Sequence, residues 1–455
     1  MKIGVIGGAG VRTVIFINGL IARCEKLHIT EVVLYDIDKE KLDIIEKLCR
    51  YVVKRSGSSL QVTAADEAVG AIRNMDYVVT TLRVGGDHAR VVDERTALGR
   101  GVIGQETTGV GGFSMAVRTI PVLLEYMELI RREAPNAWVF NFTNPSGLVT
   151  QALYSAGYER VIGICDAPSS MKYRMAGFLG VSEEDLYVEF FGLNHLSWIR
   201  SVRVRGEDIT KALISDDAFL SGIQEMEIFD REAIRETGLL PNEYLYYYYH
   251  RERALENMLR SPMTRGETIE AVNQAMFREL KAMDIDKDPE AALQVFLWGM
   301  QERENSYMTI ESASAIRPKL EKGHLPIPEG MGYAGVMLDC IEGLQRDQPK
   351  SLVLSIPNRG ALPFLQDEDV VEMTCFVSEG GIRPVGQTEV PDMCETYIRL
   401  IKRYERLTVE AVREGSREKA IQALMIHPLV NSWSLARDLV DDYEKAYGGA
   451  FLRKN

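Results

Sequence analysis

The sequence predicts an α/β protein, with a doubly wound parallel sheet in its N-terminal part and an interlocked α+β domain in its C-terminal part. Short apolar strands alternate with helical segments at the start of the chain, as in a parallel sheet covered on both faces. A glycine-rich turn joins the first strand to the first helix. With 455 residues, the chain exceeds the usual size of one compact domain. We therefore expect one domain at residues 1–165 and a second at 166–455, without a flexible linker between them.

The strands of the first part are short runs of apolar residues that end in glycine, proline or polar residues. The helices show apolar positions that recur on one face, and one of them contains Pro121. The predicted strands cover residues 2–8, 31–38, 60–65, 77–86, 137–147 and 160–168. The predicted helices cover residues 13–24, 39–53 and 111–135.

The second part is less regular. Mostly helical patterns cover residues 227–260, 268–283 and 396–427. Strand-like segments lie at 351–360 and 370–381. No internal repeat or low-complexity tract interrupts the chain, so we expect its two parts to pack against each other.

Composition excludes several classes of protein. A net charge of -13 argues against a nucleic-acid-binding protein, which would carry a basic surface. The six cysteines include no CxxC pair, as expected for reduced thiols in the cytoplasm. No signal peptide and no apolar run long enough to span a membrane is found. We therefore expect a cytoplasmic protein that binds neither nucleic acid nor membrane.

The first glycine-rich turn predicts a dinucleotide site. Gly7, Gly8 and Gly10 lie where a strand meets a helix, so the backbone can approach a pyrophosphate and the helix N-terminus favours its charge. Asp36 ends the second strand, where its carboxylate can accept hydrogen bonds from ribose hydroxyls and would repel a 2′-phosphate. This pattern favours NAD over NADP in a Rossmann-type domain. A tight turn without a ligand is the alternative.

Polar residues follow the later strands, at the sheet edge where ligands of α/β proteins bind. Arg83 leaves a buried strand and needs an anion or a carboxylate partner. Asn144 precedes a proline and is either a substrate contact or a turn former. Cys165 is either functional or a small core residue, and Asp166 is either functional or a helix N-cap.

Two further residues are candidates for the same site. His195 lies in the otherwise apolar stretch "FFGLNHLSW", and a thiolate such as Cys165 can share a divalent metal with an imidazole. Two protein ligands suit a catalytic metal whose other positions are taken by substrate and water. A buried histidine bonded to backbone is the alternative. Tyr244 precedes four consecutive tyrosines and is either a base or part of their packing.

The order of these segments resembles glycoside hydrolase family 4. The segments are "GVIGG", "LRVGG", "IGQETTG", "NFTNPSG", "GICD", "GLNH" and "PNEYLYYY", and the resemblance runs from Met1 to about Tyr447. Members of this family are NAD- and divalent-metal-dependent glycosidases, many of them 6-phospho-glucosidases, and they do not use a pair of carboxylates. The resemblance implies a fold like that of lactate and malate dehydrogenases and a homodimer or homotetramer.

The resemblance also implies roles for single residues. Cys165 and His195 would bind the metal, with Mn²⁺ expected, and Tyr244 would remove the proton from C2 of the sugar after NAD⁺ has oxidised C3. Asp166 matches the general acid of α-acting members, which β-acting members replace with Asn. Other segments resemble the 6-phospho-β-glucosidases, so the two signals indicate different anomers.

Two segments depart from the family pattern. Arg12 replaces part of the usual serine, aromatic, Thr-Pro sequence after the glycine loop, and Glu329 stands where phospho-glucosidases carry an arginine. Because a carboxylate repels a phosphate, a plain or otherwise acidic hexoside is an alternative to a 6-phospho-glucoside held by Arg83. A 2-hydroxyacid dehydrogenase and a non-catalytic NAD sensor are further alternatives.

Overall fold

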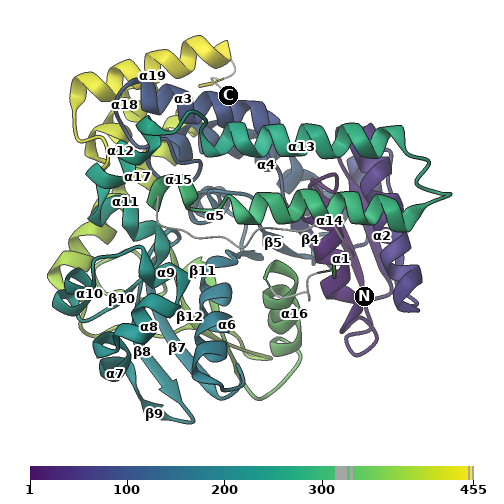
Figure 1. Cartoon of the computed structure of the whole chain (residues 1–455), viewed down its shortest axis with the longest axis horizontal. Helices are drawn as coiled ribbons and strands as arrows, with labels where there is room; N and C mark the ends of the chain where they lie inside the picture. Colours follow the sequence, from purple (N-terminus) through teal and green to yellow (C-terminus); the bar gives the residue numbers. More distant parts are fainter. Residues whose placement is uncertain (313–324, 328–331, 449–450, 453–455) are drawn as a thin grey trace.

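A nine-stranded sheet runs through the centre of the molecule (Figure 1). The computed structural model describes residues 1–312, 325–327, 332–448 and 451–452. The strand order is β13-β12-β11-β6-β5-β4-β1-β2-β3, in which β1 to β6 are parallel. These six strands are β1 (Lys2–Ile6), β2 (Glu31–Tyr35), β3 (Gln61–Ala64), β4 (Tyr77–Thr80), β5 (Trp138–Asn141) and β6 (Val161–Gly163). The predicted parallel sheet is confirmed.

Three strands from the second part of the chain continue the same sheet. β11 (Lys350–Pro357), β12 (Val370–Ser378) and β13 (Gly381–Pro384) are antiparallel, and β11 joins the parallel strands by pairing with β6. The sequence pattern identified β11 and β12 but not β13, and it did not identify the neighbours of these strands, because apolar alternation does not encode strand direction. The division at residue 165 stays a prediction, since one sheet includes strands from both sides of it.

Both faces of the sheet are covered, because neighbouring residues of each parallel strand enter different hydrophobic clusters. Val78 packs into one cluster and Val79 into the other, and Val139 and Phe140 are divided in the same way. This arrangement explains why the strands are almost continuously apolar. The helices of this part are α1 (Thr13–Ile21), α2 (Lys39–Ser56), α3 (Gly86–Gly99), α4 (Gly109–Glu133), α5 (Ser146–Ser155) and α6 (Ala167–Leu179), with a short 3-10 helix, η1 (Ala68–Ala71).

Several details of the first part differ from the sequence prediction, which also included neither α5 nor α6. The strand predicted at 77–86 ends at Thr80, and α3, which the sequence pattern missed, begins at Gly86. Gly85 and Gly86 both have positive φ angles, which turn the chain from the strand into the helix. Pro121 lies inside α4, as predicted.

The stretch "FFGLNHLSW" forms a β-hairpin. β7 (Leu186–Leu193) pairs antiparallel with β8 (Leu196–Val204), so Asn194 and His195 form the turn. β9 (Glu207–Asp208) and β10 (Leu240–Pro241) both pair with β8, and β7 packs against β12 of the large sheet. Short helices cover this small sheet: α7 (Thr210–Ser215), α8 (Asp217–Gly222), α9 (Gln224–Glu227) and α10 (Arg231–Thr237).

Two long predicted helices are broken in the structure. The region 227–260 is interrupted at Gly238, which has a positive φ, and continues as β10, η2 (Glu243–Leu245), α11 (Tyr246–Tyr249) and α12 (Arg251–Arg260). The region 396–427 divides at Gly415, which also has a positive φ, into α17 (Asp392–Glu414) and α18 (Arg417–Ile426). In both places a glycine ends a helix in the left-handed conformation.

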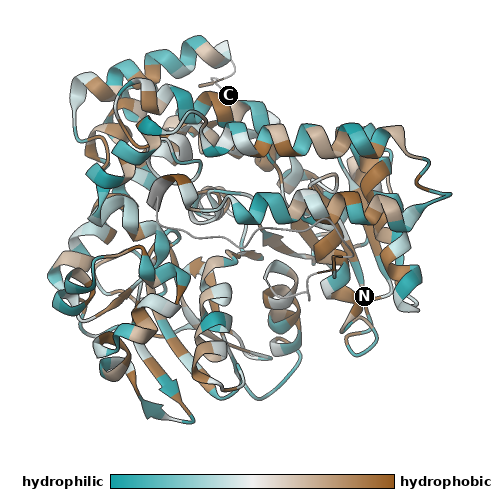
Figure 2. Ribbon diagram, in the orientation of Figure 1, coloured by the Kyte–Doolittle hydropathy of each residue, from teal (hydrophilic) through white to brown (hydrophobic). Residues whose placement is uncertain are grey.

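The remaining helices frame the sheet. α13 (Arg265–Ala282) and α14 (Pro289–Asn305) lie side by side across one face of the molecule (Figure 1). Teal and brown positions alternate along both helices in Figure 2, as expected for helices with one buried side. α15 (Thr309–Ser312), α16 (Tyr333–Gly343) and α19 (Trp433–Tyr447) complete the fold. Within the part of the chain that the structure describes, no helix is long and apolar enough to cross a membrane.

Candidate active site and family

One cavity of about 910 Å³ collects the predicted site residues. It lies at the carboxyl ends of the parallel strands, beside β1 and β4, where the order of the strands reverses. The hairpin of β7 and β8, the η2 turn and α13 and α14 also contribute side chains. The predicted residues that line it are Gly7, Gly10, Asp36, Arg83, Asn144, Cys165, Asp166, His195 and Tyr244.

The glycine loop has little room for side chains. Gly7 has a φ of +96°, and a Cβ atom there would lie 2.4 Å from the carbonyl oxygen of Thr81. A Cβ atom on Gly8 would lie 2.9 Å from the Cβ atom of Leu34, so Gly8 packs against β2 and does not line the cavity. Gly10 does line the cavity, at the turn into α1. The loop therefore leaves a backbone surface that a pyrophosphate can approach.

Asp36 is held at the edge of this loop. Its carboxylate accepts hydrogen bonds from the backbone N–H of Ala9 at 3.1 Å and of Asp38 at 3.0 Å. Both bonds fix its orientation at the end of β2, beside Gly7 and Gly10 in the cavity wall. This geometry fits an adenosine ribose bound next to the loop.

Cys165 and His195 meet in the cavity, although 30 residues separate them in the chain. The Sγ atom of Cys165 lies 3.7 Å from Nε2 of His195, and both side chains are buried. Burial lowers the pKa of His195 to about 4, which leaves the imidazole neutral and able to donate a lone pair to a metal. No group of three or more His, Cys, Asp or Glu side chains suited to a metal occurs among the described residues. The pair fits a metal that shares its coordination with a substrate.

Asn194 anchors the turn that carries His195. Its Oδ1 accepts the backbone N–H of Gly147 at 2.9 Å, and its Nδ2 donates to Oε2 of Glu372 at 2.8 Å. The turn is therefore tied to the start of α5 and to β12. Sequence reasoning missed Glu372 because 178 residues separate it from Asn194.

We expect Asn194→Ala to destabilise the protein. The change leaves the N–H of Gly147 and the carboxyl of Glu372 buried without this partner. Each buried group that loses its partner lowers the free energy of unfolding by about 1–3 kcal/mol. Urea unfolding measures the loss, with the exposed Asn136→Ala as the control. Equal unfolding midpoints for the two variants would contradict this prediction.

Tyr244 lies in η2, whereas the four consecutive tyrosines form the helix α11 that follows it. Asn242 accepts the backbone N–H of Tyr244 at 3.0 Å, and the ring of Tyr244 lies 4.0 Å from the imidazole of His195, measured between ring centroids. Tyr247, by contrast, donates from its hydroxyl to the sulfur of Met308 at 3.5 Å. The geometry thus distinguishes Tyr244, which lies beside the histidine, from its neighbours.

Asp166 does not cap α6 through its side chain. Its carboxylate accepts a hydrogen bond from Arg12 in an ion pair. The guanidinium of Arg12 also lies 5.2 Å from the centroid of the Tyr333 ring. Asn144 accepts the backbone N–H of Ser146 at 3.3 Å, as a turn former does, and also lines the cavity. Glu329 lies outside the described residues.

Arginines accumulate on one side of the cavity. Arg83 and Arg90 pair with Glu106 at 2.8 Å and 3.1 Å. Burial and the nearby charges of Arg12, Arg90 and Arg83 together lower the pKa of Arg303 to about 10. Sequence reasoning missed Arg90, Glu106 and Arg303, although Glu106 belongs to the quoted segment "IGQETTG". These neighbouring guanidinium groups can hold an anionic ligand.

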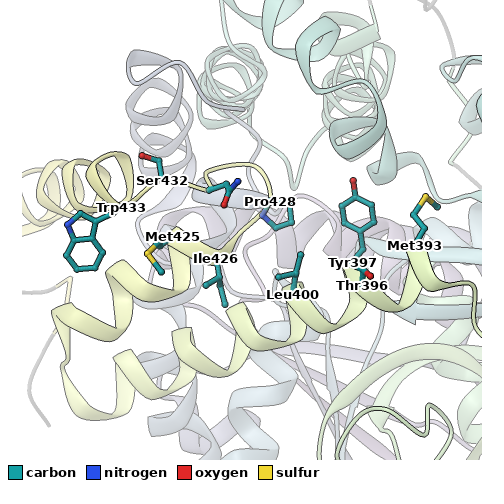
Figure 3. Close-up of a pocket in the computed structure, with 10 residues that line it drawn as sticks. Met393, Thr396, Tyr397, Leu400, Met425, Ile426, Pro428, Ser432 and Trp433 are labelled. Carbon is teal, nitrogen blue, oxygen red and sulfur yellow. The ribbon is translucent and has the colours of Figure 1, made fainter.

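A second hollow has a different character. This groove, of about 740 Å³, lies along α17, the end of α18 and the start of α19 (Figure 3). Its lining includes Met393, Leu400 and the exposed Trp433, and none of the lining residues is charged. The groove lacks both a metal-binding pair and a glycine loop, so it does not match the chemistry of the larger cavity.

Comparison with known proteins agrees with the geometry. The family models "Family 4 glycosyl hydrolase" and "Family 4 glycosyl hydrolase C-terminal domain" match residues 2–181 and 190–430. The chain is 31% identical to the 6-phospho-beta-glucosidase of Thermotoga maritima, over 98% of both chains. It is 30% identical to that of Escherichia coli, over 98% of this chain and 96% of the relative.

Solved structures give the same result. The Thermotoga maritima enzyme, solved with manganese, NAD⁺ and glucose-6-phosphate, superposes with a TM-score of 0.82 at 29% identity over the whole of both chains. Malate dehydrogenase of Plasmodium falciparum shares the fold, with a TM-score of 0.51 at 13% identity over 94% of this chain and 99% of that one. The predicted similarity to the dehydrogenase fold is thus confirmed, and the chain belongs to family 4 of the glycosyl hydrolases.

Proposed function

We propose that this enzyme hydrolyses the O-glycosidic bond of 6-phospho-glucosides with the help of NAD and a divalent metal, with Mn²⁺ preferred. The observation that carries this proposal is the convergence of the Cys165–His195 pair, the glycine loop and the arginines on one cavity. The relatives named 6-phospho-beta-glucosidase and the structure with manganese, NAD⁺ and glucose-6-phosphate support it.

The residues divide the reaction among them. Bound NAD supplies a hydride acceptor for C3 of the sugar, and a divalent cation supplies positive charge beside the sugar oxygens. Tyr244, next to His195, removes the proton from C2. Asp166 or water donates a proton to the departing oxygen, and Asp166 must first take up a proton, because its carboxylate is ion-paired with Arg12 in the structure. Arg83 and Asn144 hold the sugar and its phosphate from the carboxyl ends of the neighbouring parallel strands β4 and β5.

The phosphate assignment rests on the arginine cluster. Burial, together with crowding by Arg12, Arg90 and Arg83, disfavours the charged form of Arg303, and a bound anion would relieve the repulsion among these arginines. A plain or otherwise acidic hexoside is the second candidate. Among the acidic sugars, a hexuronic acid would offer a carboxylate to the same arginine cluster.

A substrate panel tests the proposal. The same nitrophenyl leaving group on glucose, glucose 6-phosphate and glucuronic acid is assayed with and without NAD⁺ and Mn²⁺, in both anomers. We expect the fastest turnover with the phosphorylated sugar, and only when both cofactors are present. A phosphorylated substrate turned over no faster than plain glucose would contradict the phosphate assignment. Stoichiometric accumulation of NADH would indicate a dehydrogenase instead, because the glycosidase returns the hydride.

Asp36 sets the choice of nucleotide. Asp36→Ala is expected to weaken NAD binding by about 1–3 kcal/mol, the worth of hydrogen bonds to a charged acceptor. Calorimetric titration measures the change, with NADP as the comparison. Tighter binding of NADP than of NAD by the unchanged protein would contradict our interpretation of β2.

Four further properties belong to the same proposal. We assign the enzyme to the cytoplasm and expect a homodimer or homotetramer, which sedimentation of the purified protein measures. We also propose that residues 1–165 form the NAD-binding unit and residues 166–455 the substrate, metal and oligomerisation unit. For the anomer, the relatives near 30% identity favour the β-glucoside, whereas Asp166 favours the α-glucoside.

A further inference from the structure

Arg303 differs in its partners from three other arginines of the cavity. Arg12, Arg83 and Arg90 each form an ion pair with a carboxylate. Within the part of the chain that the structure describes, Arg303 forms no ion pair, although it lines the same cavity. Its guanidinium instead donates from Nη1 to Oδ1 of Asn273 at 2.7 Å. Because an amide carries no net charge, this partner leaves the positive charge of Arg303 uncompensated.

Asn273 uses both ends of its amide group. Its Oδ1 accepts the hydrogen bond from Arg303, and its Nδ2 donates to Oδ2 of Asp87 at 2.6 Å. The side chain of Asn273 is 7% exposed and lines the cavity. An ionised carboxylate only accepts hydrogen bonds and a guanidinium only donates them, so the two partners fix which end of the amide faces which. Asn273 is therefore a neutral bridge between a negative and a positive side chain.

Three helices meet at this bridge. Asp87 lies in the first turn of α3, Asn273 lies in the middle of α13, and Arg303 lies in the last turn of α14. α13 packs against both of the other helices and runs beside α14 in Figure 1. Asn273 is 186 positions from Asp87 and 30 positions from Arg303 in the chain, so no local sequence pattern could indicate the bridge.

The bridge keeps two opposite charges apart. A carboxylate in direct contact with a guanidinium commonly forms two parallel hydrogen bonds, which occupy the donors that a ligand would use and compensate the positive charge. Asn273 lies between Asp87 and Arg303, so it holds the guanidinium in place without such an ion pair. A sugar phosphate binds to an arginine through both the charge and the N–H donors. The arrangement thus leaves Arg303 able to bind an anion in the cavity.

We propose that Asn273 is a positioning residue for the phosphate of the substrate, and that Arg303 is the arginine that it holds for this phosphate. This role rests on the proposed function, because it concerns the anion site of the same cavity. It makes the affinity for a phosphorylated sugar depend on the distance between the carboxylate of Asp87 and the guanidinium of Arg303.

Exchange of the two neighbouring side chains tests this role. The double variant Asp87→Asn with Asn273→Asp keeps the same groups, the same net charge and both hydrogen bonds, but its carboxylate contacts Arg303 directly. We expect this holoenzyme, with NAD⁺ and Mn²⁺, to bind glucose 6-phosphate about 10- to 100-fold more weakly, the usual worth of hydrogen bonds to a charged group. Calorimetric titration measures the dissociation constant. The KM for the phosphorylated nitrophenyl glucoside should rise by a similar factor, with a smaller change in kcat.

Two single variants complete the experiment. Asn273→Ala removes the bridge, so that Arg303 can turn onto Asp87, and we expect about a 10-fold loss of affinity for glucose 6-phosphate. Gln274→Ala changes the exposed neighbour on the same helix and is the matched control, with the affinity of the unchanged enzyme. NAD binding and thermal unfolding of each variant detect a structural defect independently of the phosphate.

An unchanged affinity for glucose 6-phosphate in the double variant would overturn the role of Asn273 and leave the proposed function intact. An equal loss of affinity for glucose 6-phosphate and for NAD would also overturn it, because a merely structural role produces that result. Should the double variant fail to fold, the affinity of Asn273→Ala decides by the same criteria. If the unchanged enzyme binds glucose 6-phosphate no more tightly than glucose, the phosphate assignment is wrong and the role of Asn273 is wrong with it.

Discussion

Cys165→Ser is expected to abolish glycoside hydrolysis while leaving the protein folded. An alcohol is a far weaker metal ligand than a thiolate, but it is nearly the same size, so the packing around the end of β6 survives. The buried thiol lies 3.7 Å from the imidazole of His195. Activity with added Mn²⁺ measures the loss of hydrolysis, metal content measures the loss of the metal, and circular dichroism measures whether the protein stays folded.

Cys24→Ser provides the matched control. That thiol is also buried, but it contacts the carbonyl of Ile21 and the hydroxyl of Ser58. The hydroxyl of a serine at position 24 can form hydrogen bonds with the same two groups. We expect full activity from this variant. Full activity of Cys165→Ser in the presence of a chelator would exclude the metal role of Cys165.

His195→Ala is expected to abolish hydrolysis as well, with a larger effect on folding. The residue occupies the turn of the hairpin at a φ of 61°, and its ring lies against Tyr244. A small residue there leaves a gap beside the tyrosine ring. Unfolding in urea separates this loss of stability from the loss of metal binding.

Tyr244→Phe is expected to lower the rate of hydrolysis by about 10²–10⁴-fold, which is the usual worth of a positioned base. The ring remains, so its contact with His195 and the packing of η2 are retained. Solvent exchange at C2 of the bound sugar should fall by the same factor. Hydride transfer from C3 should survive, because that step does not use the phenol.

Tyr247→Phe is the control for this experiment. Tyr247 is 1% exposed and its hydroxyl contacts the sulfur of Met308, so its removal should change the kinetics little. If Tyr247→Phe slowed C2 exchange as much as Tyr244→Phe, the base would be wrongly assigned. A Tyr244→Phe variant with normal exchange would have the same consequence.

Much of the fold could be predicted because it depends on local pattern. The strands β1, β2 and β4 are short apolar runs, and the residues that form the glycine loop lie close together in the sequence. The breaks at Gly238 and Gly415 were missed, because a glycine within a helical pattern is tolerated as often as it ends the helix. The sheet partners of β11 and β12 were missed because pairing between distant strands leaves no local signal.

By itself, the sequence determined the fold class, the glycine loop with Asp36, and Cys165, His195 and Tyr244 as candidates, because each lies in a short segment with its own chemical character. Only the tertiary structure decided which side chains meet. It placed Arg12 on Asp166, Glu372 on Asn194, and Tyr307 on Glu243. The first contact joins residues 154 positions apart in the chain, and the second joins residues 178 positions apart. Such contacts arise because strands from both parts of the chain end at one cavity.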